Sequence, residues 1–151
     1  MVTKLYSRIT FLLFFLLAPC CYTENLMKNL NLNIVEAYEK YKENNLLIVD
    51  VRTNKEWNET GVIPNSILVN MHDDNYQENS DFIEKVIQVL KSNAEKNITF
   101  ICASGARSEI VASFFLDKGY KNISHIPEGI IGKNNNGWLY LGYPLKSLEI
   151  N

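Results

Sequence analysis

ICASGARSEIVASFF, residues 101–115, brings together an apolar run, a thiol, a turn of small residues and a cation. The apolar run ends at Cys102, and Arg107 follows after the turn. From Arg107 onward the residues are typical of a helix, and Gly119 is the kind of residue that commonly ends one. The stretch therefore predicts a buried strand, a tight turn and a helix, with the thiol where strand gives way to turn.

The segments on either side repeat this alternation of strands and helices. Apolar and β-branched runs predict strands, and apolar residues at spacings of three and four predict helices. The expected helices lie within residues 34–45, 79–97 and 107–120, and the expected strands within 46–52, 67–69, 98–102 and 122–126. This order predicts an α/β fold in which helices flank a mainly parallel central sheet.

One expected helix carries a possible start signal. Ser80 or Asp81 is the expected N-cap of the helix within 79–97, and Asp81 with Glu84 has the spacing of a capping box. We also expect a turn at Pro64 before the strand at 67–69.

The whole chain suits one compact domain with a hydrophobic core. It has 151 residues, of which 46% are hydrophobic. Its formal net charge is -2, and its lysines are scattered rather than grouped into a basic stripe. The charge pattern therefore argues against a nucleic-acid partner.

Residues 1–21 have the pattern of a signal peptide. Lys4 and Arg8 precede an apolar run at residues 9–18, which is shorter than the roughly 20 residues of a spanning helix. LLAPCC, residues 16–21, resembles a bacterial lipoprotein box with Cys20 as the lipidated residue, although simple cleavage is an equal alternative. We expect an exported protein, either periplasmic or anchored as a lipoprotein, with a polar tether at 22–32 and a folded domain at 33–148.

The cysteine count leaves one thiol for the folded domain. The chain has three cysteines, and Cys20 and Cys21 lie at the end of the leader. Cys102 alone cannot build a disulfide framework, so it is either a buried, inert residue or a thiol kept for chemistry.

The surroundings predicted for Cys102 favour chemistry. In a parallel sheet, ligands bind at the carboxyl ends of the strands, where loops run into helices. Backbone N–H groups of the turn, the start of the next helix and Arg107 would all stabilise a thiolate. The sequence therefore predicts that Cys102 is the catalytic nucleophile and that a cradle binds an anionic substrate. The cradle residues are Ala103, Ser104, Gly105, Ala106, Arg107 and Ser108, the last also a helix cap.

Three segments, in order, resemble the rhodanese family of single-domain sulfurtransferases. They are IVDVRTNKEWNETGVIPNSILVN at 48–70, CASGARS at 102–108 and IPEGIIGKNNNGWLYLGYPL at 126–145. The resemblance covers nearly all of residues 33–145 and identifies 33–148 as a rhodanese-like domain.

The resemblance implies that Cys102 takes the outer sulfur of a donor such as thiosulfate and holds it as a persulfide. The sulfur then passes to cyanide, a thiol or an acceptor protein. No metal or organic cofactor is implied, and His72 and His125 do not have the spacing of metal ligands. Many family members carry Arg or Lys where this chain has Ala103, so the natural donor stays open.

Two other functions remain open at this stage. Cysteine phosphatases and arsenate reductases use a similar loop, but theirs is one residue longer than residues 103–106. A rhodanese fold can also serve as a non-catalytic binding or sulfide-sensing module, although such members usually lack the cysteine.

Asp50 and Arg52 are expected to support the site from the end of a neighbouring strand. Asp50 is expected to hold the active-site loop or Arg107 by hydrogen bonds. Arg52 is expected to form a structural pair with Glu56, with some charge lent to the site.

Overall fold

The computed structural model describes residues 30–148. The predicted signal peptide at 1–21, including Cys20, and residues 22–29 of the predicted tether lie outside this range. Leu30 and Leu32 are buried, and Asn31 forms a parallel β-bridge with His125. The end of the predicted tether is therefore part of the packed domain. None of the helices within 30–148 is long and apolar enough to cross a membrane.

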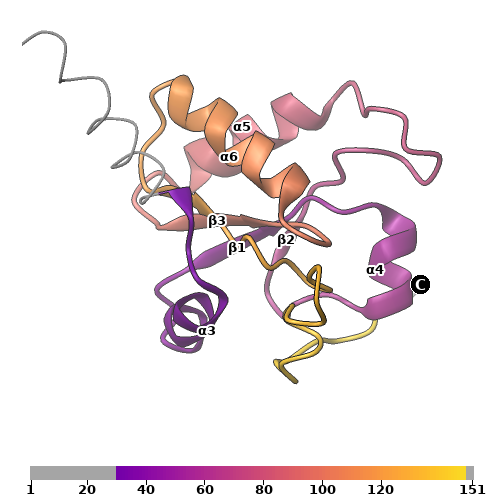
Figure 1. Cartoon of the computed structure of the whole chain (residues 1–151). Coiled ribbons are helices and arrows are strands. Elements are labelled where there is room, and N and C mark those ends of the chain that lie inside the picture. The colour runs from indigo at the N-terminus through magenta and orange to yellow at the C-terminus, as the bar shows by residue number, and fades with distance from the viewer. Residues whose placement is uncertain (1–29, 149–151) are drawn as a thin grey trace, which may run out of the picture.

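A four-stranded parallel sheet with the order β2-β1-β3-β4 forms the centre of the domain (Figure 1). The strands are β1 (Leu47–Asp50), β2 (Ile67–Leu68), β3 (Ile98–Ile101) and β4 (Ile123–His125). Asp50 pairs with Leu68 on one side and with Ile101 on the other, so these three strands end at one edge. The predicted α/β fold with a parallel sheet is confirmed.

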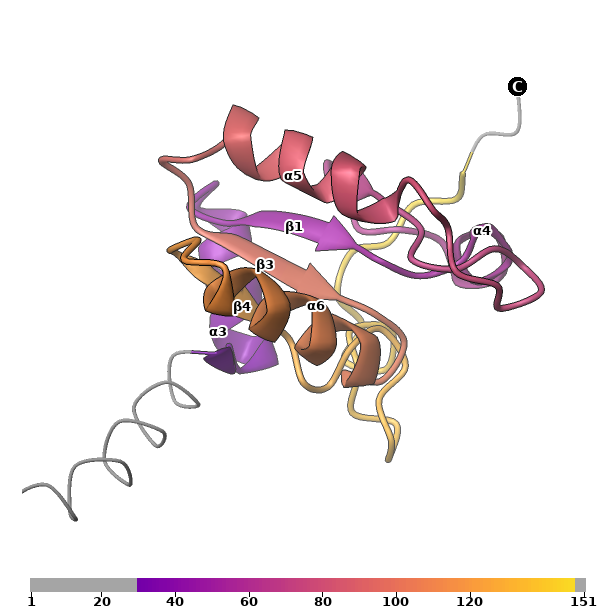
Figure 2. The same cartoon turned by 90° about the horizontal axis from the view of Figure 1, so that it is seen from above.

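Helices cover both faces of this sheet. Helices α5 (Phe82–Ser92) and α6 (Ala106–Asp117) lie over one face, and α3 (Ile34–Lys42) lies over the other (Figures 1 and 2). The strands contribute side chains to the core on both faces of the sheet, because successive side chains point to opposite faces. Val49 and Phe100 belong to the core cluster under α5 and α6, whereas Ile48 and Ile101 belong to the cluster beside α3.

Helix α4 (Asn54–Thr60) was not predicted from the sequence. It lies beyond the carboxyl end of β1 (Figure 2), and Trp57 is its one buried residue. A single buried residue gives no apolar periodicity, but its start signal is present as a capping box between Thr53 and Glu56. In a short helix without an apolar stripe, the capping residues are the sequence signal that could have predicted it.

The capping box predicted for α5 is wrong. Asp81 is the N-cap residue, but its side chain makes no capping bond and instead pairs with Lys85 at 2.7 Å. The helix also ends at Ser92, earlier than the expected limit at residue 97, and the Asn93 side chain donates to the Val89 carbonyl.

A buried ion pair joins the end of β1 to α4. The Arg52 guanidinium donates to the Asp50 carboxylate at 2.8 Å, to the Gly61 carbonyl at 2.8 Å and to the Thr60 hydroxyl at 2.6 Å. The predicted Arg52–Glu56 pair is therefore wrong, since Glu56 offers Arg52 only its backbone carbonyl. The expected bond from Asp50 to Arg107 or to the active-site loop is not among the contacts of residues 30–148. Asp50 and Arg52 instead bind each other, and Arg52 ties the end of α4 to the end of β1.

Replacing Arg52 with Met should destabilise the fold strongly. The variant leaves the Asp50 carboxylate buried without its cation, which costs about 3–5 kcal/mol. Urea unfolding followed by tryptophan fluorescence measures this loss. Lys40→Ala is the control because it removes an exposed pair with Glu36, and it should change the stability far less. Equal effects of the two substitutions would contradict the structural role of the buried pair.

Candidate active site

Cys102 lies directly after β3 and is only 1% exposed. Its side chain belongs to the core cluster under α5 and α6, while the turn that follows runs to the first residue of α6, Ala106. Small residues fill this turn because the backbone must reverse direction within a few residues between a buried strand and a packed helix. The thiol is therefore held rigidly at the carboxyl edge of the sheet, as the sequence predicted.

The carbonyl groups of the turn are bound by a second loop, residues 129–132. The Ile130 N–H donates to the Cys102 carbonyl at 2.8 Å, and the Ile131 N–H donates to the Ala103 carbonyl at 2.9 Å. By contrast, the N–H groups of residues 103–108 donate to no acceptor within residues 30–148. Unused N–H groups at the start of a helix form a site for an anion.

Two glycines allow the turn and the second loop to meet. Gly105 has a φ of +94° and Gly129 a φ of +70°, both in the region that side chains disfavour. A Cβ atom on Gly129 would lie 2.6 Å from the carbonyl oxygens of both Cys102 and Ala103. A residue with a side chain at position 129 would thus push away the carbonyls that the second loop holds.

Arg107 reaches the cradle but is bound by Glu56 of α4. The two guanidinium nitrogens donate to the two carboxylate oxygens at 2.8 and 2.6 Å, and both side chains are mostly buried. Burial disfavours the charged form of Arg107, but the hydrogen bond and charge of Glu56, with smaller effects from Cys102 and Tyr76, raise its pKa. The predicted cation is therefore permanently charged, but a carboxylate already balances it.

Ser108 contacts the thiol rather than capping the helix. Its buried hydroxyl donates to the Gly105 carbonyl at 2.9 Å, and the Cys102 thiol donates to Ser108 Oγ at 3.5 Å. The predicted capping role is wrong, since Gly105 is the N-cap residue and no side chain caps α6. Ser108 also lies 3.3 Å from a ring nitrogen of His125.

The structure thus brings together most of the predicted site but not all of it. Cys102, the turn at 103–105 and the first three residues of α6 are continuous, whereas Asp50 and Arg52 pair with each other and support α4. Sequence reasoning missed Glu56, His125 and residues 129–132 as parts of the site. Glu56 was signalled by the capping box with Thr53, but nothing in the local sequence indicated His125.

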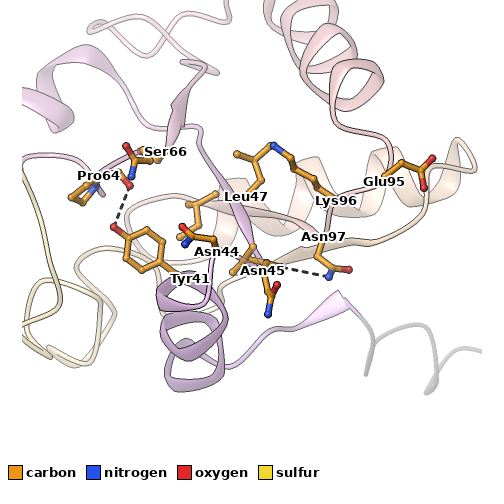
Figure 3. Close-up of a pocket in the computed structure, with 12 residues that line it drawn as sticks. Tyr41, Asn44, Asn45, Leu47, Pro64, Ser66, Glu95, Lys96 and Asn97 are labelled. Carbon is orange, nitrogen blue, oxygen red and sulfur yellow. Dashed lines mark hydrogen bonds between the residues drawn. The ribbon is translucent and has the colours of Figure 1, made fainter.

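A hollow of about 450 Å³ lies where the strands begin (Figure 3). Tyr41 donates to the Pro64 carbonyl across it at 3.3 Å, and Asn45 and Asn97 lie along its lining. Its polar side chains include no thiol or imidazole. The reactive groups are instead at the opposite edge of the sheet, and residues 30–148 contain no cluster of side chains that would hold a metal ion.

Comparisons with known proteins agree with the fold. A family model for the rhodanese-like domain matches residues 33–132. An uncharacterized protein of Rickettsia rickettsii is 34% identical over 110 residues, which cover 72% of this chain and 89% of that protein.

Solved structures agree with the same fold. A rhodanese-related protein from Thermoplasma volcanium is 29% identical with a TM-score of 0.59, and the match covers 78% of this chain and 97% of that one. Thiosulfate sulfurtransferase from Pseudomonas aeruginosa has a TM-score of 0.62 at 21% identity, covering 83% of this chain and 22% of that one. The latter likeness shows the fold alone.

Replacing Gly129 with Ala should both destabilise the domain and disturb the thiol. Gly142→Ala is a matched control, because Gly142 has a nearly equal φ of +69° but no atom within 4 Å of an added Cβ. The control should cost about 1–2 kcal/mol for its backbone conformation. Gly129→Ala should cost a further ~1–3 kcal/mol because the carbonyls must move.

Thermal unfolding and the rate of Cys102 alkylation measure the two effects of Gly129→Ala. If both variants lose the same stability and keep the same alkylation rate, the close approach of the two loops does not shape the site.

Glu56→Gln should remove a contribution to stability that depends on pH. Burial acts to raise the pKa of Glu56, but bonds from Arg107 and the Thr53 N–H, with the charges of Arg107 and Arg52, lower it below 4.5. A lowered folded pKa means that the contribution is present above pH 4.5 and is lost as the pH falls through the folded value. At neutral pH the variant should be less stable by about 1–3 kcal/mol.

Urea unfolding of both proteins from neutral to strongly acidic pH tests this dependence. The curves should converge at the acid end, because protonated Glu56 resembles Gln. Parallel curves across the whole range would contradict the assigned role of the ion pair.

Proposed function

Because the chain belongs to the rhodanese-like domain family, we propose that it is a sulfurtransferase in which Cys102 carries the sulfur as a persulfide. The observation that supports this most is the buried thiol followed by six residues whose N–H groups have no acceptor within residues 30–148. Such groups suit a small anion attached to the thiol. The activity is covalent catalysis by a thiolate, helped by fixed hydrogen-bond donors.

In the first step the Cys102 thiolate attacks the outer sulfur of the donor. A new S–S bond forms, and the bond within the donor breaks with its electron pair leaving on the rest of the donor. In the second step a nucleophilic acceptor attacks the outer sulfur, and the Cys102 thiolate leaves. The N–H groups of residues 103–108 stabilise the negative charge on the outer sulfur between these steps.

The charges around the turn favour donors with less charge than thiosulfate. Ala103 adds no cation, and the charge of Arg107 is balanced by Glu56. A dianion therefore meets a site with little net positive charge, whereas an organic persulfide needs only the N–H groups for its outer sulfur. We propose a small persulfide as the donor, and a thiol or an acceptor protein as the acceptor.

The cellular setting is proposed on the N-terminal sequence alone. Residues 1–21 support export to the periplasm, with or without a lipid on Cys20. Donor and acceptor would then be small molecules or proteins of that compartment.

Incubation of the full chain with glutathione persulfide, followed by peptide mass spectrometry, tests the proposal. The peptide that contains Cys102 should gain one sulfur atom, cyanide should remove it, and thiosulfate should load it more slowly. Cys102→Ser should abolish the gain and still unfold cooperatively, with a somewhat lower midpoint because a hydroxyl replaces a thiol in the hydrophobic core.

Cys20 and Cys21 lie in other peptides and serve as internal controls for non-specific persulfidation. Absence of a gain at Cys102 with either donor would contradict the proposal. Hydrolysis of an aryl phosphate by the same sample would indicate a phosphatase, and neither activity would indicate a binding module.

A further inference from the structure

A line of polar groups runs from the buried thiol through two buried side chains to Asn31 at the surface. The Cys102 thiol lies 3.5 Å from Ser108 Oγ, which lies 3.3 Å from His125 Nδ1. His125 Nε2 lies 2.7 Å from Asn31 Oδ1. Cys102, Ser108 and His125 are each no more than 2% exposed, so the contacts among these three are sheltered from water, whereas Asn31 is exposed. The sulfur-transfer steps described above use none of these groups beyond Cys102.

The contact with Asn31 determines how the His125 ring can bond. Oδ1 of Asn31 only accepts, so Nε2 of His125 must carry a hydrogen. In the neutral ring, Nδ1 is then a bare acceptor that faces the Ser108 hydroxyl. Asn31 is held in place because the Leu32 N–H donates to the His125 carbonyl at 2.8 Å, which ties the two segments together.

We propose that His125 receives the proton of the Cys102 thiol through the hydroxyl of Ser108, with Asn31 as the positioning residue. The proposal deepens the proposed function, on which it rests, by naming the group that generates the nucleophile. In this step the thiol proton passes to Ser108 Oγ while the hydroxyl proton of Ser108 passes to His125 Nδ1. The products are a thiolate and an imidazolium, so the total charge is unchanged.

Each side chain in the line has a hydrogen-bond partner after the transfer. The imidazolium donates from Nε2 to Asn31 and from Nδ1 to Ser108, and the Ser108 hydroxyl turns to donate to the thiolate. A lone buried thiolate would be costly, but this arrangement provides it with a hydrogen bond and with a nearby opposite charge. The Ser108 hydroxyl must leave the Gly105 carbonyl, to which it donates in the starting state, but that carbonyl also accepts the Glu109 N–H at 3.0 Å.

The surrounding charges are compatible with this transfer. Burial lowers the pKa of His125, while the charge of Glu109 on α6 and a hydrogen bond with the Gly105 carbonyl act against the lowering. His125 is therefore neutral at neutral pH with Nδ1 as an acceptor, and the charge of Glu109 and the Gly105 carbonyl favour the proton once it is on the ring. Arg107, with Glu56 bound to it, is the charged group beside the thiol and favours the thiolate.

The alkylation rate of Cys102 as a function of pH tests the inference without any sulfur donor. Iodoacetamide is added to the full chain, and the peptide that contains Cys102 is followed by mass spectrometry. His125→Gln keeps a polar side chain but cannot take the proton, so alkylation at neutral pH should fall about tenfold, which corresponds to one unit of thiol pKa. Ser108→Ala should have a similar effect, and Ser108→Thr should restore most of the rate.

Two further comparisons separate a shared proton from a structural role. The double variant Ser108→Ala, His125→Gln should react no more slowly than either single variant, because all three lack the same path. His72→Gln removes the other histidine of the chain and should leave the rate unchanged. A pH profile that keeps its midpoint in His125→Gln would overturn the inference, even if the overall rate changed.

Nuclear magnetic resonance of the histidine rings gives a test that does not depend on the His125 variant folding. In the full chain, Cys102→Ala should shift the midpoint of His125 titration, whereas His72 should titrate as before. If the His125 midpoint is the same with and without the thiol, the two groups do not share a proton. Neither measurement involves sulfur transfer. A negative result would therefore rule out the proton transfer to His125 without ruling out the proposed sulfurtransferase activity.

Discussion

The candidate site depends on two backbone carbonyls, those of Cys102 and Ala103, being held by another part of the chain. Residues 129–132 bind both of them, which leaves the N–H groups of the turn available to a ligand. This loop is held in turn by Trp138, whose backbone N–H donates to the Gly129 carbonyl at 2.9 Å. Trp138 is fully buried, and its ring meets Tyr38 of α3 edge to face. Packing on the face of the sheet away from α6 therefore shapes the anion site.

Charge in the site is set by a second set of contacts around α4. Glu56 binds Arg107 with both oxygens and also accepts the Thr53 N–H, so the start of α4 and the active-site cation are one network. Behind it, the buried pair of Asp50 and Arg52 holds α4 against β1. The helix positions a single carboxylate, which reduces the net positive charge of the cradle without removing Arg107.

Much of the fold follows from local pattern, and the misses have physical causes. The strands around Val49 and Phe100 are predictable because burial on both faces demands continuous apolar residues. The partners of Arg52 were not predictable, because Asp50 and Glu56 are both within reach in sequence and only the path of α4 decides between them. His125 was assigned correctly to a strand, but its place behind the thiol follows from β4 lying beside β3, which no local pattern reveals.

The anion site and the activation of the thiol are built from different parts of the molecule. In the proposed site main-chain N–H groups bind the anion, so a change such as Ala103 alters the charge of the turn without altering its hydrogen-bond donors. Side chains from α6, β4 and the segment before α3 follow one another from the thiol to Asn31. Since the two sets share only Cys102 and the loop that follows it, the choice of donor can change while the means of forming the thiolate is kept.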